Sequence, residues 1–247
     1  MQDKHFMTDK KLINHIISVS DVKVNETVLE IGAGRGELTR EIAKRAGKVI
    51  AVEIDKTFQK HLKDIPNTEI IFENALTVLK NQKIRFDKII SNLPYSISEP
   101  LIWLLIKKDF KSGVLTVPKK FAYRLVAKPG DELYSKLSVV AQVFFNIKIM
   151  QEVPKSAFHP KPKTNSVIIK IIPKPKNLSA LVLLKQGMKV KNAVREALCA
   201  SKGLTKREAR KIIKRLNINK LLDKKTTELK KKDIETIISC LKPEELC

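Results

Sequence analysis

Short apolar segments alternate with helical patterns through the first half of the chain. Apolar runs rich in β-branched residues are typical of buried strands, and five occur before residue 120, at 27–31, 48–52, 69–73, 86–90 and 114–117. Helices are expected between them, at 37–45, 57–64 and 98–107. This alternation predicts an α/β fold with a doubly wound, mostly parallel sheet.

The flanking segments extend the same unit. Before the first strand, Leu12, Ile13, Ile16 and Ile17 recur along one helical face, and Thr8 is expected to cap that helix. The segments expected after the last strand are two helices and the two strands of an edge hairpin, at 119–127, 137–145, 147–153 and 166–172. Residues 1–176 are therefore predicted to form one nucleotide-binding domain.

The pattern changes at the proline-containing segment 173–176, which is typical of a linker. No strand pattern recurs beyond it, and narrow apolar stripes at 190–200, 206–216 and 232–241 predict helices too weak to be stable alone. Residues 177–247 are predicted to form a small helical domain.

The charge of the chain points to a polyanionic partner. Lysine and arginine number 49 against 26 acidic residues, a net charge of +23. From residue 185 onward there are 18 basic and 8 acidic residues, so the helical domain is the more charge-dense part and a candidate RNA-binding surface. A Lys-rich solvated surface is the simpler alternative. An anionic membrane also fits the charge, but no apolar run approaches the length of a membrane span.

The cysteines and the N-terminus bear on location. Cys199, Cys240 and Cys247 have no metal-ligand spacing, which favours a reducing compartment over a disulfide framework. No apolar leader follows Met1. A cytoplasmic location is expected.

A glycine turn follows the first strand. The spacing Gly32-x-Gly34-x-Gly36 lacks the third glycine of a dinucleotide fingerprint, because Glu37 occupies that position, and no phosphate-binding Lys-Ser/Thr follows. The turn therefore suits a ligand without a pyrophosphate. Glu53, at the tip of the second strand, is placed to bind ribose hydroxyls, or is a surface charge.

Two asparagines follow the third and fourth strands. Asn74 could pair with an adenine edge or be an ordinary turn residue. Asn92 opens the sequence Asn92-Leu93-Pro94-Tyr95, whose Asn amide oxygen and Leu93 carbonyl could accept both N–H bonds of an exocyclic amine. Pro94 fixes that carbonyl and Tyr95 offers a face for stacking. The alternative is a proline turn that ends a strand.

The loop at 156–165 is rich in proline and lysine and carries Phe158. Phe158 could be presented to a ligand, although the sequence alone favours a buried anchor for the loop.

These motifs together resemble the ribosomal RNA adenine dimethyltransferases, and among them the small-subunit enzymes of archaeal and eukaryotic-like type. The resemblance covers about residues 2–200 and weakens in the tail. The motifs that carry it are Gln2 with His5-Phe6, Glu30-x-Gly32-x-Gly34-x-Gly36, Glu53, Asn92-Leu93-Pro94-Tyr95, the segment 134–139 and Phe158-x-Pro160-x-Pro162.

The resemblance implies S-adenosylmethionine as cofactor, with no metal. It implies that His5 and Met7 contact the cofactor, that Gly32 and Gly34 pass beneath its methionine part, and that Glu53 holds its ribose. It further implies that Asn74 meets the cofactor's adenine, that Asn92 lies between the donor methyl and the target amine, and that Tyr95 and Phe158 hold the unstacked target base. The family usually has Leu at position 7 and Asp at position 74, which puts the affinity for the cofactor in question.

The expected substrate is small-subunit rRNA within an immature small subunit. The expected reaction is the dimethylation of adjacent adenines, and the enzyme is expected to be a monomer. Two alternatives stay open on the sequence: a non-catalytic rRNA-binding assembly factor on the same fold, and a related methyltransferase acting on large-subunit rRNA or DNA.

Overall fold

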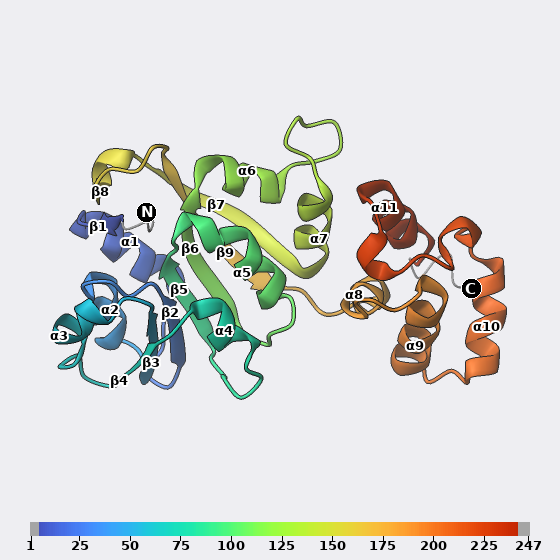
Figure 1. Ribbon diagram of the computed structural model, residues 1–247, viewed down its shortest axis with the longest axis horizontal. Coiled ribbons are helices and arrows are strands. Elements are labelled where there is room, and N and C mark those ends of the chain that lie inside the picture. The colour runs from blue at the N-terminus through green and yellow to red at the C-terminus, as the bar shows by residue number, and fades with distance from the viewer. Residues whose placement is uncertain (1–4, 242–247) are drawn as a thin grey trace. The chain divides into compact units, whose positions relative to one another are not determined.

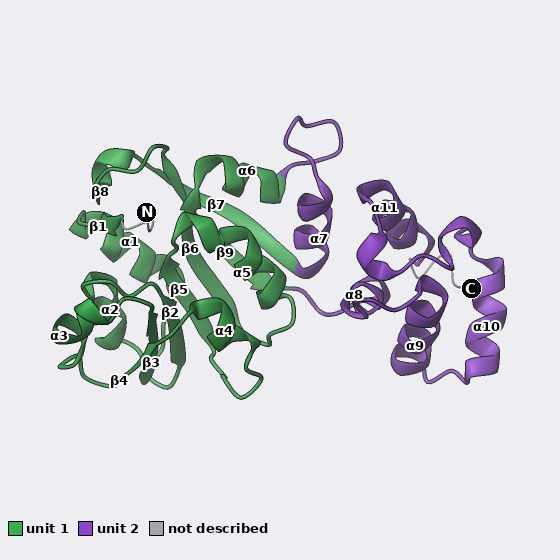
Figure 2. Ribbon diagram, in the orientation of Figure 1, with its two compact units in different colours: residues 1–126, 145–173 green, residues 127–144, 174–247 purple. Residues whose placement is uncertain are grey.

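The structure, a computed structural model, describes residues 5–241, so Gln2 and Cys247 lie outside the described part. The chain divides into two compact units, residues 1–126 with 145–173 and residues 127–144 with 174–247 (Figure 2). The predicted boundary at 176 lies close to the one at 173. Residues 127–144, however, cluster with the second unit, whereas the prediction assigned them to the first domain.

Unit 1 is built on a seven-stranded sheet of order β4-β3-β2-β5-β6-β9-β7 (Figure 1). The first five of these strands are parallel, and β9 and β7 add an antiparallel hairpin at the edge. The bounds are β2 Thr27–Ile31, β3 Lys48–Glu53, β4 Thr68–Phe72, β5 Lys88–Asn92, β6 Ser112–Pro118, β7 Phe145–Val153 and β9 Ser166–Pro173. The predicted mostly parallel sheet and its edge hairpin are confirmed.

Both faces of this sheet are covered. Successive residues of β2, Val28 and Leu29, point to opposite faces, and both are 0% exposed. The helices of unit 1 are α1 Lys10–Ser20, α2 Glu37–Ala43, α3 Gln59–Leu62, α4 Ala75–Lys80, α5 Ser98–Leu105 and α6 Lys119–Val126. The short helix α4 was not predicted.

The first helix begins one residue later than expected. The Asp9 side chain accepts hydrogen bonds from the Lys11 and Leu12 amides, at 2.8 and 3.3 Å, and is the N-cap of α1. The Thr8 amide instead donates to the carbonyl of Ala157, 3.1 Å away. The prediction of Thr8 as the cap was therefore wrong, because Thr8 is held by a distant loop.

That loop contributes to a small sheet that the sequence did not reveal. Strand β1, Phe6–Met7, pairs antiparallel with β8, Phe158–His159, so that Met7 lies opposite Phe158. The N-terminal segment and the proline-rich loop are thus joined across 150 positions of sequence.

Unit 2 is helical, as predicted for the tail. Its helices are α7 Lys136–Phe144, α8 Leu178–Leu184, α9 Val190–Lys202, α10 Lys206–Arg215 and α11 Lys231–Cys240, of which α8 was not predicted. The Tyr134 hydroxyl donates to Glu235, 2.6 Å away, and Lys231 lies 4.5 Å from the centre of the Tyr134 ring. These contacts attach the segment before α7 to α11. Within residues 5–241, no helix is long and apolar enough to span a membrane.

Candidate active site

A cavity of about 350 Å³ lies at the carboxyl ends of the parallel strands in unit 1. Segments that follow β2, β3, β4 and β5 line it together with the N-terminal segment, in the position where open α/β sheets bind ligands. Every predicted site residue except Phe158 lies on its lining: His5, Met7, Gly32, Gly34, Glu53, Asn74, Asn92, Leu93, Pro94 and Tyr95.

The glycine turn requires glycine for two reasons. Gly32 and Gly34 have φ of 75° and 53°, which other residues rarely adopt. A Cβ on Gly32 would lie 3.3 Å from the Pro94 ring, and one on Gly34 would lie 2.8 Å from the Phe6 ring. The Gly32 amide donates to the Val52 carbonyl at 2.8 Å and ties the turn to β3. The turn therefore brings bare backbone to the cavity wall.

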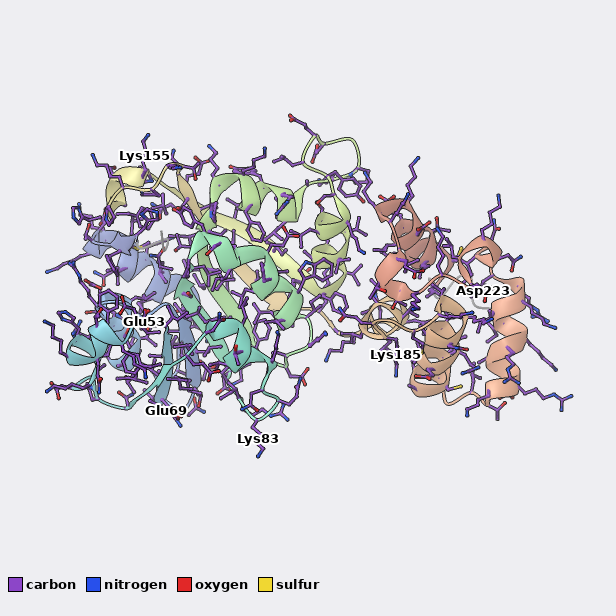
Figure 3. All side chains as sticks on the ribbon, in the orientation of Figure 1. Glu53, Glu69, Lys83, Lys155, Lys185 and Asp223 are labelled. Carbon is purple, nitrogen blue, oxygen red and sulfur yellow. The ribbon has the colours of Figure 1, made fainter. Side chains whose placement is uncertain are left out.

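Glu53 is the last residue of β3 (Figure 3), and backbone amides hold its carboxylate in place. One oxygen accepts from the Gly34 amide at 2.8 Å, and the other accepts from the Ile54 and Asp55 amides at 2.8 and 2.9 Å. A carboxylate can accept about four hydrogen bonds, so acceptor capacity remains at the cavity. Binding of ribose hydroxyls by Glu53 stays a prediction.

Asn92 presents an acceptor that lacks a protein partner. Its amide nitrogen donates to the His5 carbonyl at 2.8 Å, and this bond identifies which side-chain atom is nitrogen. The amide oxygen is buried and has no hydrogen-bond partner among the described residues. An unpaired buried acceptor costs about 1–3 kcal/mol, which a donor from a ligand would recover.

Tyr95 and His5 lie together beside Asn92. Their ring centroids are 5.6 Å apart with the planes at 40°, and the Tyr95 hydroxyl hydrogen-bonds to Ser166. The His5 Nδ1 is 2.8 Å from the Pro160 carbonyl, so Nδ1 carries the proton. The Tyr95 side chain is therefore held by its hydroxyl and by the neighbouring His5 ring.

Asn74 and Phe158 each have a structural role in addition to the ligand-binding role that was predicted for them. The Asn74 side-chain oxygen accepts from the Leu76 amide at 2.9 Å and caps α4, although the residue also borders the cavity. Phe158 is 2% exposed and belongs to the hydrophobic core with Met7 and Ile168, and it is not on the cavity lining. Phe158 is therefore a buried anchor. Because it does not line this cavity, the cavity gives no support to its predicted contact with the target base.

Two lining residues were not assigned a role from the sequence. Glu30 is 1% exposed, and burial raises the pKa of its carboxyl to about 8, with the Glu37 and Glu53 charges adding to the effect. One of its oxygens has no hydrogen-bond partner in the described structure. Ile54, directly after Glu53, is 56% exposed at the cavity. The sequence signal for Glu30 was an acid inside an apolar strand. The signal for Ile54 was its place directly after the acid at the tip of the second strand.

These residues fit S-adenosylmethionine. The amino group and ribose hydroxyls of the cofactor are donors, and the cavity offers the acceptors Glu30, Glu53 and Asn92. The glycine turn with Gly32 and Gly34 forms part of the same lining. The fold and this site define the chain as an S-adenosylmethionine-dependent methyltransferase of the Rossmann-like class.

Comparison with known proteins gives the family. A profile of the family described as "Ribosomal RNA adenine dimethylase" matches residues 2–239. The chain is 34% identical to the "Probable ribosomal RNA small subunit methyltransferase A" of Pyrococcus furiosus, over 97% of this chain and 90% of that protein. It is 43% identical to the Methanosarcina mazei protein of the same name, over 70% of this chain and 64% of that protein.

A solved structure agrees with this match. The crystal structure of a dimethyladenosine transferase from Plasmodium falciparum superposes with a TM-score of 0.67 at 26% identity, covering 95% of this chain and 96% of that one. The chain belongs to the ribosomal RNA adenine dimethylase family.

Proposed function

We propose that the protein dimethylates the exocyclic amine of adjacent adenines in small-subunit rRNA, with S-adenosylmethionine as the methyl donor. Membership of the family, the names of the archaeal relatives and the net charge of +23 support this function. The observation that carries it is the buried, unpaired amide oxygen of Asn92 at the cavity.

When bound, S-adenosylmethionine supplies an electrophilic methyl group, so the chain needs to prepare only the nucleophile. The lone pair of an adenine amine is delocalised into its ring. The Asn92 oxygen and the Leu93 carbonyl would accept the two N–H bonds and favour a tetrahedral nitrogen whose lone pair is free to react. The His5 carbonyl holds the Asn92 amide in the required orientation. This is positioning combined with preorganised electrostatics.

The base has to leave its stack to reach these acceptors. Tyr95 would receive it with a stacking contact of about 1–3 kcal/mol. The bond of the Tyr95 hydroxyl to Ser166 and the neighbouring His5 ring keep this ring in place without the base. Dimethylation, rather than a single transfer, is inferred from the family alone.

The cofactor would rest against the N-terminal segment and the glycine turn. His5 and Met7 would border it, Gly32 and Gly34 would lie beneath its methionine part, Glu53 would bind its ribose, and Asn74 would meet its adenine. Unit 2 would bind RNA, and the whole would act as a cytoplasmic monomer on an immature small subunit. The basic excess of the tail supports the RNA-binding role.

The variant Asn92→Ala tests the proposal. We expect methyl transfer to fall at least 10²-fold, as with other preorganised polar groups, while the Kd for S-adenosylmethionine changes only a few-fold. The measurements are transfer of tritiated methyl groups to immature small subunits and calorimetric cofactor binding. Asn146→Ala, at an exposed position of β7, is the matched control. Turnover at the wild-type rate in Asn92→Ala would refute the assignment.

A non-catalytic assembly factor is the second candidate, and the engagement of the Asn74 oxygen in the α4 cap favours it, because that oxygen is less available to a cofactor. Methyl transfer by the wild-type protein separates the two. Mapping dimethyladenosine in small- and large-subunit rRNA, with and without the protein, identifies which of the two rRNAs is the substrate.

A further inference from the structure

Helix α10 concentrates positive charge within unit 2. Its ten residues include six cations and one acid, Glu208. All six cations are exposed: Lys206, Arg207, Arg210, Lys211, Lys214 and Arg215. One helix thus carries a net charge of +5, half of the +10 found from residue 185 onward.

Four of these cations form a single face. Arg207, Arg210, Lys211 and Lys214 follow the spacing i, i+3, i+4 and i+7, which places them along one side of a helix over about 10 Å. The opposite side carries the buried residues Ala209 and Ile213. We call these four residues the cationic strip.

The acid of α10 does not pair with the strip. Glu208 accepts from the Thr205 amide and hydroxyl at 2.8 and 2.7 Å, and these bonds lower the pKa of its carboxyl. Its capping box turns it towards the helix start. Lys211 contributes a smaller part of that lowering.

Some other cations of unit 2 are paired with acids. Lys191 is paired with Asp223 at 2.7 Å, Lys185 with Glu196 at 3.0 Å, and Lys224 with Asp233 at 3.1 Å. Within the described residues, no salt bridge reaches any member of the strip. The strip therefore differs from these three lysines in having no acid partner within the described part of the chain.

We propose that the cationic strip binds the phosphate backbone of the RNA substrate and anchors it without reading its sequence. The inference rests on the proposed function and assigns the RNA contact of unit 2 to one helix face. Arginine and lysine bind phosphate strongly, and arginine does so with paired hydrogen bonds. Phosphate contacts position a nucleic acid and carry no sequence information.

The strip suits RNA better than a membrane or an acidic protein. A helix that lies on a membrane inserts its apolar face, but that face of α10 is buried within unit 2. Protein interfaces gain most of their energy from central aromatic and apolar anchors, and the strip has none. Closely spaced charge without an apolar centre matches a polyanion.

The test compares two triple variants of the full chain. Arg207→Gln/Arg210→Gln/Lys214→Gln removes charge from the strip and leaves Lys211, which interacts with Glu208. Lys63→Gln/Lys80→Gln/Lys83→Gln removes the same charge from exposed lysines of unit 1; Lys83 lies on the loop after α4 (Figure 3). The probe is a labelled small-subunit rRNA stem–loop with two adjacent adenines in its loop.

We expect the strip variant to bind this RNA about 10- to 100-fold more weakly at 0.1 M salt. Its slope of log K against log salt should be shallower by about 2, since each lost phosphate contact removes roughly 0.7–0.9. The KM for RNA should rise while kcat at saturating RNA stays within about twofold, because the chemistry lies in unit 1. The control variant should bind RNA as the wild type does. In both variants the cofactor affinity and the thermal melting temperature should equal those of the wild type.

Equal slopes for the two triple variants, in a protein that methylates the RNA, would overturn the strip assignment alone. A wild-type protein that binds cofactor but neither binds nor methylates any rRNA would overturn the proposed function and the strip with it.

Discussion

Two residues that line one cavity each carry a buried acceptor atom with no protein partner in the described structure, the Asn92 amide oxygen and one oxygen of Glu30. Each costs free energy in the ligand-free protein, because burial removes water and nothing replaces it. A ligand that supplied the missing donor would recover this free energy. Under the proposed function, the target amine would supply this donor to Asn92 and the cofactor would supply it to Glu30.

Glu30 makes the ligand-free protein sensitive to pH. Its carboxyl has a pKa near 4.5 when unfolded and about 8 when buried, so the native state binds more protons between these values. Stability is therefore full below about pH 4.5 and falls as pH rises towards 8. Each unit of that interval corresponds to about 1.4 kcal/mol at most.

We expect Glu30→Gln to remove much of this fall, by on the order of a few kcal/mol between pH 5 and 8. Urea unfolding of the ligand-free protein at both pH values measures it. The exposed Glu132→Gln is the control and should follow wild type. A Glu30→Gln profile parallel to wild type would show that the buried carboxyl does not titrate as inferred.

At the scale of elements, Asn74 both caps helix α4 and borders the cavity. As the N-cap it satisfies the Leu76 amide, and it stands where the family usually has Asp. Asp and Asn are equivalent caps, whereas Ala is not. A substitution can therefore separate the structural role from the binding role.

We expect Asn74→Ala to lose about 1 kcal/mol of unfolding free energy and Asn74→Asp to lose almost none. Asn74→Asp should also bind S-adenosylmethionine more tightly, because its second oxygen is available to accept from adenine. Chemical unfolding and calorimetry measure the two effects. An Asp variant with unchanged affinity would remove Asn74 from the cofactor site, and an Ala variant with unchanged stability would remove it from the cap.

The strands, the edge hairpin and the part of the cavity lining at the strand ends were predictable because they depend on local periodicity and on one topological rule, whereas His5 and Met7 were expected there only from the family resemblance. Parallel strands bring their carboxyl ends together, so Gly32, Glu53 and Asn92 meet although they are distant in sequence. Short elements were missed for the opposite reason. Helix α4 has six residues and β1 has two, and neither length supports a periodic signal.

The pairing partner of Phe158 and the displaced cap at Asp9 share one cause. Both follow from the pairing of β1 with β8 and from the bond between Thr8 and Ala157. These contacts join segments about 150 residues apart, and no local pattern in either segment encodes the other. The grouping of 127–144 with the helical unit is long-range in the same way.

At the scale of the whole molecule, we expect the net charge of +23 to affect the rate of association with RNA more than the rate of methyl transfer. A strongly positive protein attracts a polyanion through solution and raises the association rate constant. S-adenosylmethionine carries little net charge and gains little from this field. Salt should therefore separate the two substrates.

We expect the association rate constant for the rRNA stem–loop, measured by stopped-flow fluorescence, to fall at least tenfold between 0.05 and 0.3 M KCl. The dissociation rate constant should change less, because screening acts mainly on the approach of separated charges. The Kd for S-adenosylmethionine over the same range is the internal control and should stay within about twofold. If cofactor binding weakened in parallel with RNA association, salt would be perturbing the fold. An association rate constant independent of salt would mean that the basic excess is solvated surface, and that encounter with RNA depends on local contacts alone.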